Sequence, residues 1–225
     1  MAKFNDIREL AQQNARWVSN SPKDWMNYLD VAARLYRYSF KDTLLIHAQR
    51  PDATACAELE VWNKKMNRWV NRGAKGIAVF EDAERSRQRL IHYFDISDTH
   101  ESRYSRPVPI WDMKPEYTDD VIETLENTFG DLENRDSLAD AVMSAAKNAV
   151  EDNIPDYLSD LMYAADDSFL YGLSEDMITS MYRKAVTNSV AYMMMTRLGI
   201  DTEPYFETED FSVITNFNTP EALNA

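Results

Sequence analysis

The spacing of apolar positions changes along the chain and predicts helices at both ends with short strands between them. Over residues 4–19 and 22–38 apolar side chains recur every three or four positions, as on one face of an amphipathic helix. Ser21 and Pro22 separate these helices, because serine is a good N-cap and proline suits the first helical position. Two more helices are expected, over residues 42–49 and 53–66, the second with Cys56 on its buried face.

After residue 66 apolar and polar side chains alternate, which is the pattern of half-buried strands. Three strands are expected, over residues 68–71, 76–81 and 90–96. A loop over residues 71–75 joins the first two, and Gly73 and Gly76 mark positions where the backbone needs a positive φ or approaches another group closely. Residues 97–118 hold three of the eight prolines and show little periodicity, so a domain boundary is expected there.

Beyond this boundary the pattern is helical almost throughout. Helices are expected over residues 119–129, 138–150, 153–165 and 174–198. Ser174 caps the last of these helices and Gly199 ends it. The predicted fold class is therefore α+β: N-terminal helices packed on a small antiparallel sheet in residues 1–110, then a mostly α-helical domain in residues 111–225.

Charge divides the chain at the same place. Residues 1–110 hold 18 Lys and Arg against 14 Asp and Glu, a net charge of +4. Residues 111–225 hold 6 against 24, a net charge of −18, and the whole chain carries −14. So large an asymmetry indicates two domains with different partners. The first half suits nucleic acid, whereas the second half would repel it.

Several function classes lack their sequence signals. No apolar run is long enough to span a membrane, and the N-terminus MAKFNDIREL has no signal-peptide region. The single cysteine, Cys56, excludes an internal disulfide and fits a reducing cytoplasm. No phosphate-binding glycine loop, nucleophile elbow or Cys-x-x-Cys is present, and His47, His92 and His100 lie far apart. We expect a cytoplasmic protein that is not an enzyme and holds no cofactor or metal.

Residues 34–81 combine basic and aromatic side chains. This stretch holds nine Lys and Arg against five Asp and Glu, with Tyr and Trp side chains between them. Cations for phosphates and flat rings for bases suit a single-stranded nucleic-acid site, although the rings could instead form the core. The candidate phosphate ligands are Arg34, Arg37, Lys41, Lys64, Lys65, Arg68, Arg72 and Lys75. Tyr38 and Trp69 are the candidate stacking platforms, and the turn from Gly73 to Gly76 would bring backbone N–H groups close to the strand.

The expected placement of three of these cations depends on the helix predicted over residues 22–38. Arg34, Arg37 and Lys41 follow one another at spacings of three and four. A helix continued through them would therefore place all three on one face.

The run W-N-K-K-M-N-R-W-V-N-R-G-A-K-G-I-A-V, residues 62–79, resembles the N-terminal domain of ArdC-type antirestriction proteins. Related domains open large proteins of conjugative elements in Firmicutes. The likeness covers residues 20–100 and includes Leu44-Leu45-Ile46 and Gln49-Arg50-Pro51. It implies binding of single-stranded DNA in the service of a mobile genetic element in a bacterial cytoplasm.

Residues 185–192, A-V-T-N-S-V-A-Y, followed by L-G-I-D-T at 198–202, resemble the late helix of ArdC-type and related zinc peptidase domains. In those domains a Glu ligand precedes the S-V-A-Y-like run, and an upstream helix carries H-E-x-x-H. This chain has Asn188 at the Glu position and no H-E-x-x-H. Because zinc needs about three protein ligands, the resemblance implies a decayed, metal-free peptidase-like domain.

Three functions remain open. The preferred one is a non-catalytic single-stranded DNA-binding, antirestriction protein that coats or escorts incoming DNA. The alternative is an acidic, protein-directed inhibitor, in which residues 111–225 imitate DNA and occupy the basic channel of a host defence nuclease such as a CRISPR effector. The third is a noncatalytic docking domain of a larger element-encoded protein.

Overall fold

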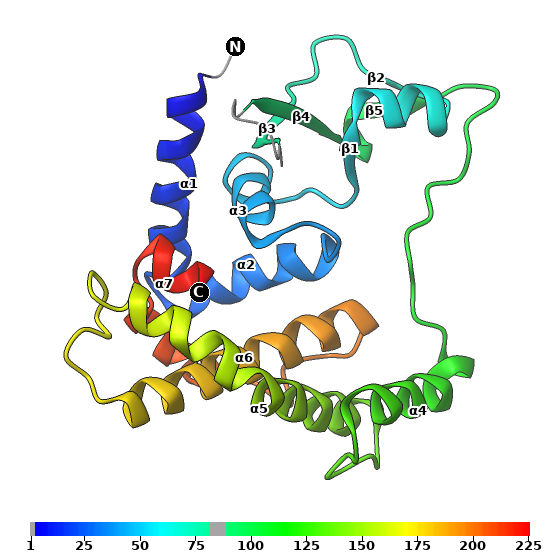
Figure 1. Cartoon of the computed structure of the whole chain (residues 1–225). Helices are drawn as coiled ribbons and strands as arrows, with labels where there is room; N and C mark the ends of the chain where they lie inside the picture. The colour runs from blue at the N-terminus through cyan, green and yellow to red at the C-terminus, as the bar shows by residue number, and fades with distance from the viewer. Residues whose placement is uncertain (1–2, 82–88) are drawn as a thin grey trace. The chain divides into compact units, whose positions relative to one another are not determined.

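The computed structural model describes residues 3–81 and 89–225 and has an α+β fold (Figure 1). Contacts between Cα atoms divide the chain into two compact units. The sheet unit comprises Met1–Asn14 and Arg34–Trp111, and the helical unit comprises Ala15–Ala33 and Asp112–Ala225. The division between Trp111 and Asp112 falls beside the boundary expected at residue 110. Residues 15–33, however, group with the helical unit instead of with the first domain.

Three helices open the chain, namely α1 (Phe4–Val18), α2 (Pro22–Arg34) and α3 (Phe40–Gln49). The predicted cap is present, since the Ser21 hydroxyl accepts a hydrogen bond from the Asp24 N–H at 3.1 Å. The prediction that α2 continues to residue 38 is wrong. The Ser39 hydroxyl accepts from the Asp42 N–H at 3.1 Å and starts α3, so the chain turns between the two helices.

Two small antiparallel sheets follow. The first has the strand order β1-β4-β3, and the second pairs β2 with β5. Their bounds are Cys56–Glu58 for β1, Arg68–Val70 for β2, Ile77–Phe80 for β3, Leu90–Asp95 for β4 and Thr99–Glu101 for β5. The three expected strands are therefore confirmed as β2, β3 and β4. β2 pairs with β5 rather than with β3, to which the loop at residues 71–75 leads.

The helix expected over residues 53–66 is wrong in its first half. There the chain forms β1, which pairs with β4. Helical backbone begins only at Leu59 and continues into a short π-helical segment, η1 (Val61–Lys65). Its buried Trp62 donates a hydrogen bond from Nε1 to the Phe94 carbonyl at 2.7 Å and so fixes η1 against the end of β4. Long-range pairing with β4 thus overrides the local helical period.

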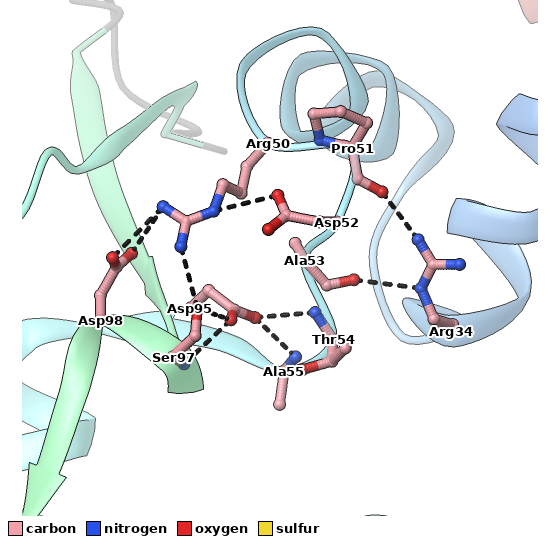
Figure 2. Close-up of polar contacts among 10 residues, drawn as sticks. All are labelled: Arg34, Arg50, Pro51, Asp52, Ala53, Thr54, Ala55, Asp95, Ser97 and Asp98. Carbon is pink, nitrogen blue, oxygen red and sulfur yellow. Dashed lines mark hydrogen bonds and ion pairs between the residues drawn. The ribbon is translucent and has the colours of Figure 1, made fainter.

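A buried carboxylate, that of Asp95, holds the start of β1 in place (Figure 2). Its side chain is only 1% exposed. Oδ1 accepts from the N–H groups of Thr54 and Ala55 at 2.7 and 2.9 Å, and Oδ2 accepts from the N–H and hydroxyl of Ser97 at 3.0 and 2.5 Å. Burial raises the pKa of Asp95, but these hydrogen bonds outweigh it and hold the pKa below its ordinary value.

Two of the N-terminal helices, α3 and the first part of α1, pack on the sheet as expected, whereas α2 groups with the helical unit. The Gln49 side chain on α3 donates to the Ala78 carbonyl at 2.9 Å and accepts from the Ala78 N–H at 3.0 Å, so it binds β3 as a neighbouring strand would. Leu45 and Ile46 of α3 and Val79 of β3 are buried. Near the start of α1, the rings of Phe4 and Phe80 lie 5.0 Å apart.

The helical unit is built on two long helices, α5 and α6, which pack along each other (Figure 1). Its elements are η3 (Pro115–Tyr117), α4 (Thr118–Phe129), α5 (Leu138–Ala164), α6 (Glu175–Leu198), η4 (Thr208–Asn216) and α7 (Pro220–Asn224). Gly199 ends α6 at φ 71°, as predicted. The two helices predicted over residues 138–165 are instead one, which continues through Pro155 with Val150 and Leu161 buried on either side of it.

Residues of α2 join the helical unit through two polar contacts. Trp25 donates from Nε1 to the Ser189 hydroxyl at 2.8 Å, and the Tyr192 hydroxyl donates to Asp30 Oδ1 at 3.0 Å. Burial, and then the charge of Asp30, raises the pKa of Tyr192 to about 12. The Tyr192 ring also meets Phe206 and Phe211 edge-on, with ring centroids 5.7 and 5.5 Å away. These contacts explain why residues 15–33 group with the helical unit.

Within the part of the chain that the structure describes, no helix combines the length and the apolar character needed to cross a membrane.

Replacing Asp95 by Asn should lower the free energy of unfolding of the sheet unit by roughly 2–4 kcal/mol, because one oxygen and its two hydrogen bonds are lost in a buried site. Urea unfolding, with hydrogen exchange over residues 54–58 to locate the loss, measures the effect. Since the pKa of Asp95 is lowered by folding, its contribution is present above pH about 4 and is lost at lower pH. Wild type and Asp95→Asn should therefore converge in acid.

Asp52→Asn is the matched control. Asp52 forms an ion pair with Arg50, but its side chain is 75% exposed. Its replacement should leave stability within about 0.5 kcal/mol of wild type. Equal losses from both substitutions would contradict the assignment of Asp95 as the main support of β1.

Candidate nucleic-acid interface

The ribbon formed by β2 and β5 is the centre of the candidate interface. Its register pairs Arg68 with Glu101, Trp69 with His100 and Val70 with Thr99. Because side chains alternate between the two faces, Trp69 and His100 lie directly opposite each other on one face, and both are exposed. Half of the Trp69 side chain is accessible to solvent. A large flat ring is thus held outward by a paired strand instead of being buried as core.

Arg68 lies on the opposite face and has a structural role there. Its Nε donates to the Thr99 hydroxyl at 2.9 Å, and its Nη1 donates to Glu101 Oε1 at 2.7 Å. The side chain is only 10% exposed. Of the cations expected to contact phosphate, Arg68 is therefore one that instead joins β2 to β5.

Exposed cations surround the ribbon on both sides. Lys64 and Lys65 precede β2, and Arg72 and Lys75 follow it. Lys64 also pairs with Glu60 at 2.5 Å. Residues 61–76 and 99–111 together hold seven Lys and Arg against one carboxylate, that of Glu101, a net charge of +6. This positive surface is denser than the expected stretch from residue 34 to residue 81, which carries +4.

Three residues of this surface, Arg103, Tyr104 and Arg106, were not foreseen from the sequence. The hydroxyls of Ser102 and Ser105 both donate to the Asn67 carbonyl at 2.7 Å, and the Arg106 N–H donates to the Met66 carbonyl at 2.9 Å. These bonds bring residues 102–106 beside the start of β2. Tyr104 is 74% exposed, and the Arg103 guanidinium lies 5.9 Å from its ring. The segment adds a second exposed ring and two cations to the ribbon.

Gly73 and Gly76 differ in their roles. Gly73 has φ +88° and open space around it, which confirms the expected positive φ. At Gly76 a Cβ would lie 2.9 Å from the His92 Cβ and 3.2 Å from the Phe94 ring. The close approach expected at Gly76 is therefore made to β4 of the same sheet. The loop between them is fixed by the Ala74 N–H, which donates to the Asn71 carbonyl at 3.0 Å.

The candidates before residue 60 do not form a shared surface on one helix. Arg34 ends α2 and donates to the carbonyls of Pro51 and Ala53 at 2.7 and 3.2 Å, which fixes the turn after α3 (Figure 2). Arg37 lies in the turn, with its guanidinium 5.5 Å from the Tyr36 ring, and Lys41 is exposed on α3. The expectation that Arg34, Arg37 and Lys41 share a helical face is wrong, because the helix ends between them.

Tyr38 is also engaged within the sheet unit. Its hydroxyl donates to the Cys56 carbonyl, and its ring meets Tyr93 edge-on at 5.4 Å. Burial and then nearby charges raise its pKa above the ordinary tyrosine value. The Tyr38 ring therefore packs against the first sheet, and Trp69 is the expected stacking platform that remains exposed.

The Cys56 thiol, the possible metal ligands and Asn188 were also candidates for chemistry. Cys56 is buried, and desolvation followed by the charge of Asp95 raises its thiol pKa to about 12. Across residues 3–81 and 89–225, no group of three His, Cys, Asp or Glu side chains is arranged to hold a metal ion. Asn188, which stands at the Glu position of the peptidase-like pattern, donates from Nδ2 to the Asp210 carbonyl at 3.0 Å.

Comparison with known proteins returns nothing similar: no protein-family model matches the chain, and neither does any curated protein or solved structure. The likeness to ArdC-type proteins therefore rests on the sequence motifs alone. Inference about function depends on the geometry and charge of the ribbon.

Replacing Gly76 by Ala should destabilise the sheet unit by about 1–3 kcal/mol, because the new methyl group would overlap His92. Urea unfolding measures the loss. Gly73→Ala meets no neighbouring atom, and it should cost only about 1–2 kcal/mol for the positive φ, confined to the loop. A Gly76→Ala variant as stable as wild type would show that the close approach to His92 does not restrict residue 76.

Proposed function

We propose that this protein binds single-stranded DNA without catalysis and acts as an antirestriction protein of a mobile genetic element. The observation that carries the proposal is the exposed Trp69–His100 pair on a ribbon with six exposed Lys and Arg side chains around it. Phosphates would contact Arg72, Lys75, Arg103 and Arg106, while bases stack on Trp69 and Tyr104. Flat exposed rings favour single strands, because the bases of a duplex are already stacked on one another.

The proposed mechanism is occlusion. A strand held by its phosphates and stacked on two rings is covered along that length and is withheld from host nucleases. No cofactor or metal takes part. The proposal places the protein in the bacterial cytoplasm, where the lone Cys56 stays reduced. The resemblance of residues 20–100 to ArdC-type N-terminal domains agrees with this role.

A second candidate function is favoured by the charge of the helical unit, which carries −18. Such a surface would repel DNA and could imitate it, so the unit could occupy the basic channel of a host defence nuclease. Nuclease inhibition that survives the loss of DNA binding in ribbon variants would favour this function. Inhibition that disappears together with DNA binding would favour occlusion.

We propose further that the helical unit is a decayed peptidase-like domain that needs no zinc. Support comes from Asn188, whose amide donates within the unit where the related domains carry a Glu ligand. Elemental analysis of the purified protein provides the check. Stoichiometric zinc would overturn this relationship.

Replacing Arg72 and Lys75 together by Ala should weaken binding of a labelled single-stranded oligonucleotide and lower its salt dependence. For two lost phosphate contacts the slope of log K against log salt should fall by about 1.4. Fluorescence anisotropy at several salt concentrations, with a matched duplex, measures both effects. The control is Lys114→Ala with Lys184→Ala, which removes two exposed cations from the helical unit. An unchanged slope in the ribbon variant would remove this loop from the interface.

Trp69→Ala should cost about 1–3 kcal/mol of binding free energy per stacked base and leave the salt slope nearly unchanged, because stacking involves no ion release. The same anisotropy titration measures it. Trp17→Ala is the control, since Trp17 is 48% exposed but belongs to the helical unit. Equal effects of the two substitutions would mean that Trp69 has no special contact with bases.

A further inference from the structure

A groove lies on the helical unit where the end of α5 meets the start of α6. Its volume is about 610 Å³. Five of its lining residues follow the helical pattern i, i+3, i+4, i+7 and i+8 and therefore lie on one face of α5. They are Pro155, Leu158, Ser159, Met162 and Tyr163. Glu175, in the first turn of α6, closes the other side.

Apolar side chains are exposed in and beside this groove. Tyr163 is 85% exposed, and Met162 is 37% exposed. In the loop from α5 to α6, Phe169 and Tyr171 are also mostly exposed, while Leu170 between them is fully buried. Hydrogen bonds hold this loop, since the Tyr171 N–H donates to the Ser168 carbonyl at 3.1 Å and the Phe169 N–H donates to Asn218 Oδ1 at 2.8 Å. The rings thus project from an anchored turn.

The surroundings of the groove are strongly acidic. From residue 148 to residue 182 the chain has no Lys or Arg and eight carboxylates. These are Glu151, Asp152, Asp156, Asp160, Asp166, Asp167, Glu175 and Asp176. Only Glu151 is held in a described ion pair, with Arg183. A groove whose α5 side is mainly apolar is therefore bordered by negative charge on both helices.

We propose that this groove binds a Lys- and Arg-rich amphipathic helix of a partner protein. An amphipathic helix places apolar residues at spacings of three and four into such a groove, and the flexible methionine side chain adapts to different partners. The carboxylates at the edge complement a basic helix and oppose DNA, acidic peptides and anionic membranes. The proposal concerns the helical unit alone and stands whether or not the ribbon binds DNA.

The partner is a different protein and not a second copy of this chain. Among the residues described, no α-helix carries a net charge above +1. The strongest positive surface lies on the β2–β5 ribbon, whose strands are only three residues long and are not helical. Charge complementarity therefore points away from self-association through this groove.

A fluorescein-labelled amphipathic peptide of leucine and lysine is the probe, titrated against the full chain by fluorescence anisotropy. Met162→Ser with Tyr163→Ser should weaken binding about tenfold or more, because the apolar contacts of the groove are lost. Tyr117→Ser, at a tyrosine that is 50% exposed on η3, should leave the affinity within about twofold. A peptide with serine in place of leucine should not bind.

The contribution of charge is tested separately. Asp152→Asn with Asp156→Asn, at exposed positions of α5, should weaken binding about threefold and lower its salt dependence. Glu116→Gln with Glu123→Gln removes the same charge at η3 and α4 and should have a smaller effect than this. Because all four residues are exposed, these variants remain informative if the groove variant fails to fold, which circular dichroism would reveal.

Any of four results would overturn the proposal. The first is no binding of the leucine–lysine peptide at low salt, and the second is equal affinity for wild type and the folded groove variant. The third is an equal effect of the two pairs of charge substitutions, which would mean that the peptide responds to net charge alone. The fourth is binding to vesicles of anionic phospholipid in preference to the peptide.

Discussion

The sheet unit depends on the hydrogen bonds that the buried carboxylate of Asp95 accepts (Figure 2). It joins two segments that are 41 residues apart, the start of β1 and the turn after β4. The same turn reaches α3, because Arg50 at the end of that helix donates to the Ser97 hydroxyl at 2.9 Å and to both oxygens of Asp98 at 3.2 Å. β5 begins at Thr99, directly after this turn. A group with no place in the proposed interface thus determines where the chain enters the ribbon.

Arginine serves two purposes in the sheet unit, and composition does not separate them. Arg34, Arg50 and Arg68 bind carbonyls, hydroxyls and carboxylates of the unit itself. Arg72, Arg103 and Arg106 are exposed around the ribbon. The first group builds the scaffold from the planar guanidinium and its several N–H donors, and the second supplies the charge. The two units also differ in the charge of their exposed surfaces: the ribbon of the sheet unit is positive, and the border of the groove in the helical unit is negative.

Local signals predicted local structure well. Ser21 and Gly199 mark helix ends because a cap depends only on residues within one turn of it. β1 was missed because its strand conformation depends on β4 and Asp95, far along the chain, while its own period is helical. The same reason hides Arg103, Tyr104 and Arg106, which reach the ribbon through bonds to Met66 and Asn67. Trp25 bonds to a residue 164 positions away, so no sequence window could group α2 with the helical unit.

The ribbon has a consequence for the order of folding. It joins residues 29 to 33 positions apart with only three residue pairs. Closing a loop of that length costs chain entropy before the few new contacts offset it. The β1–β4 pairing of the first sheet has a similar cost, but β3 and β4 pair residues only 10 to 16 positions apart. The ribbon should therefore form after β3 and β4 have paired, and it should open before they separate. A ribbon that opens locally can change its conformation around a bound ligand while the core of the sheet unit remains folded.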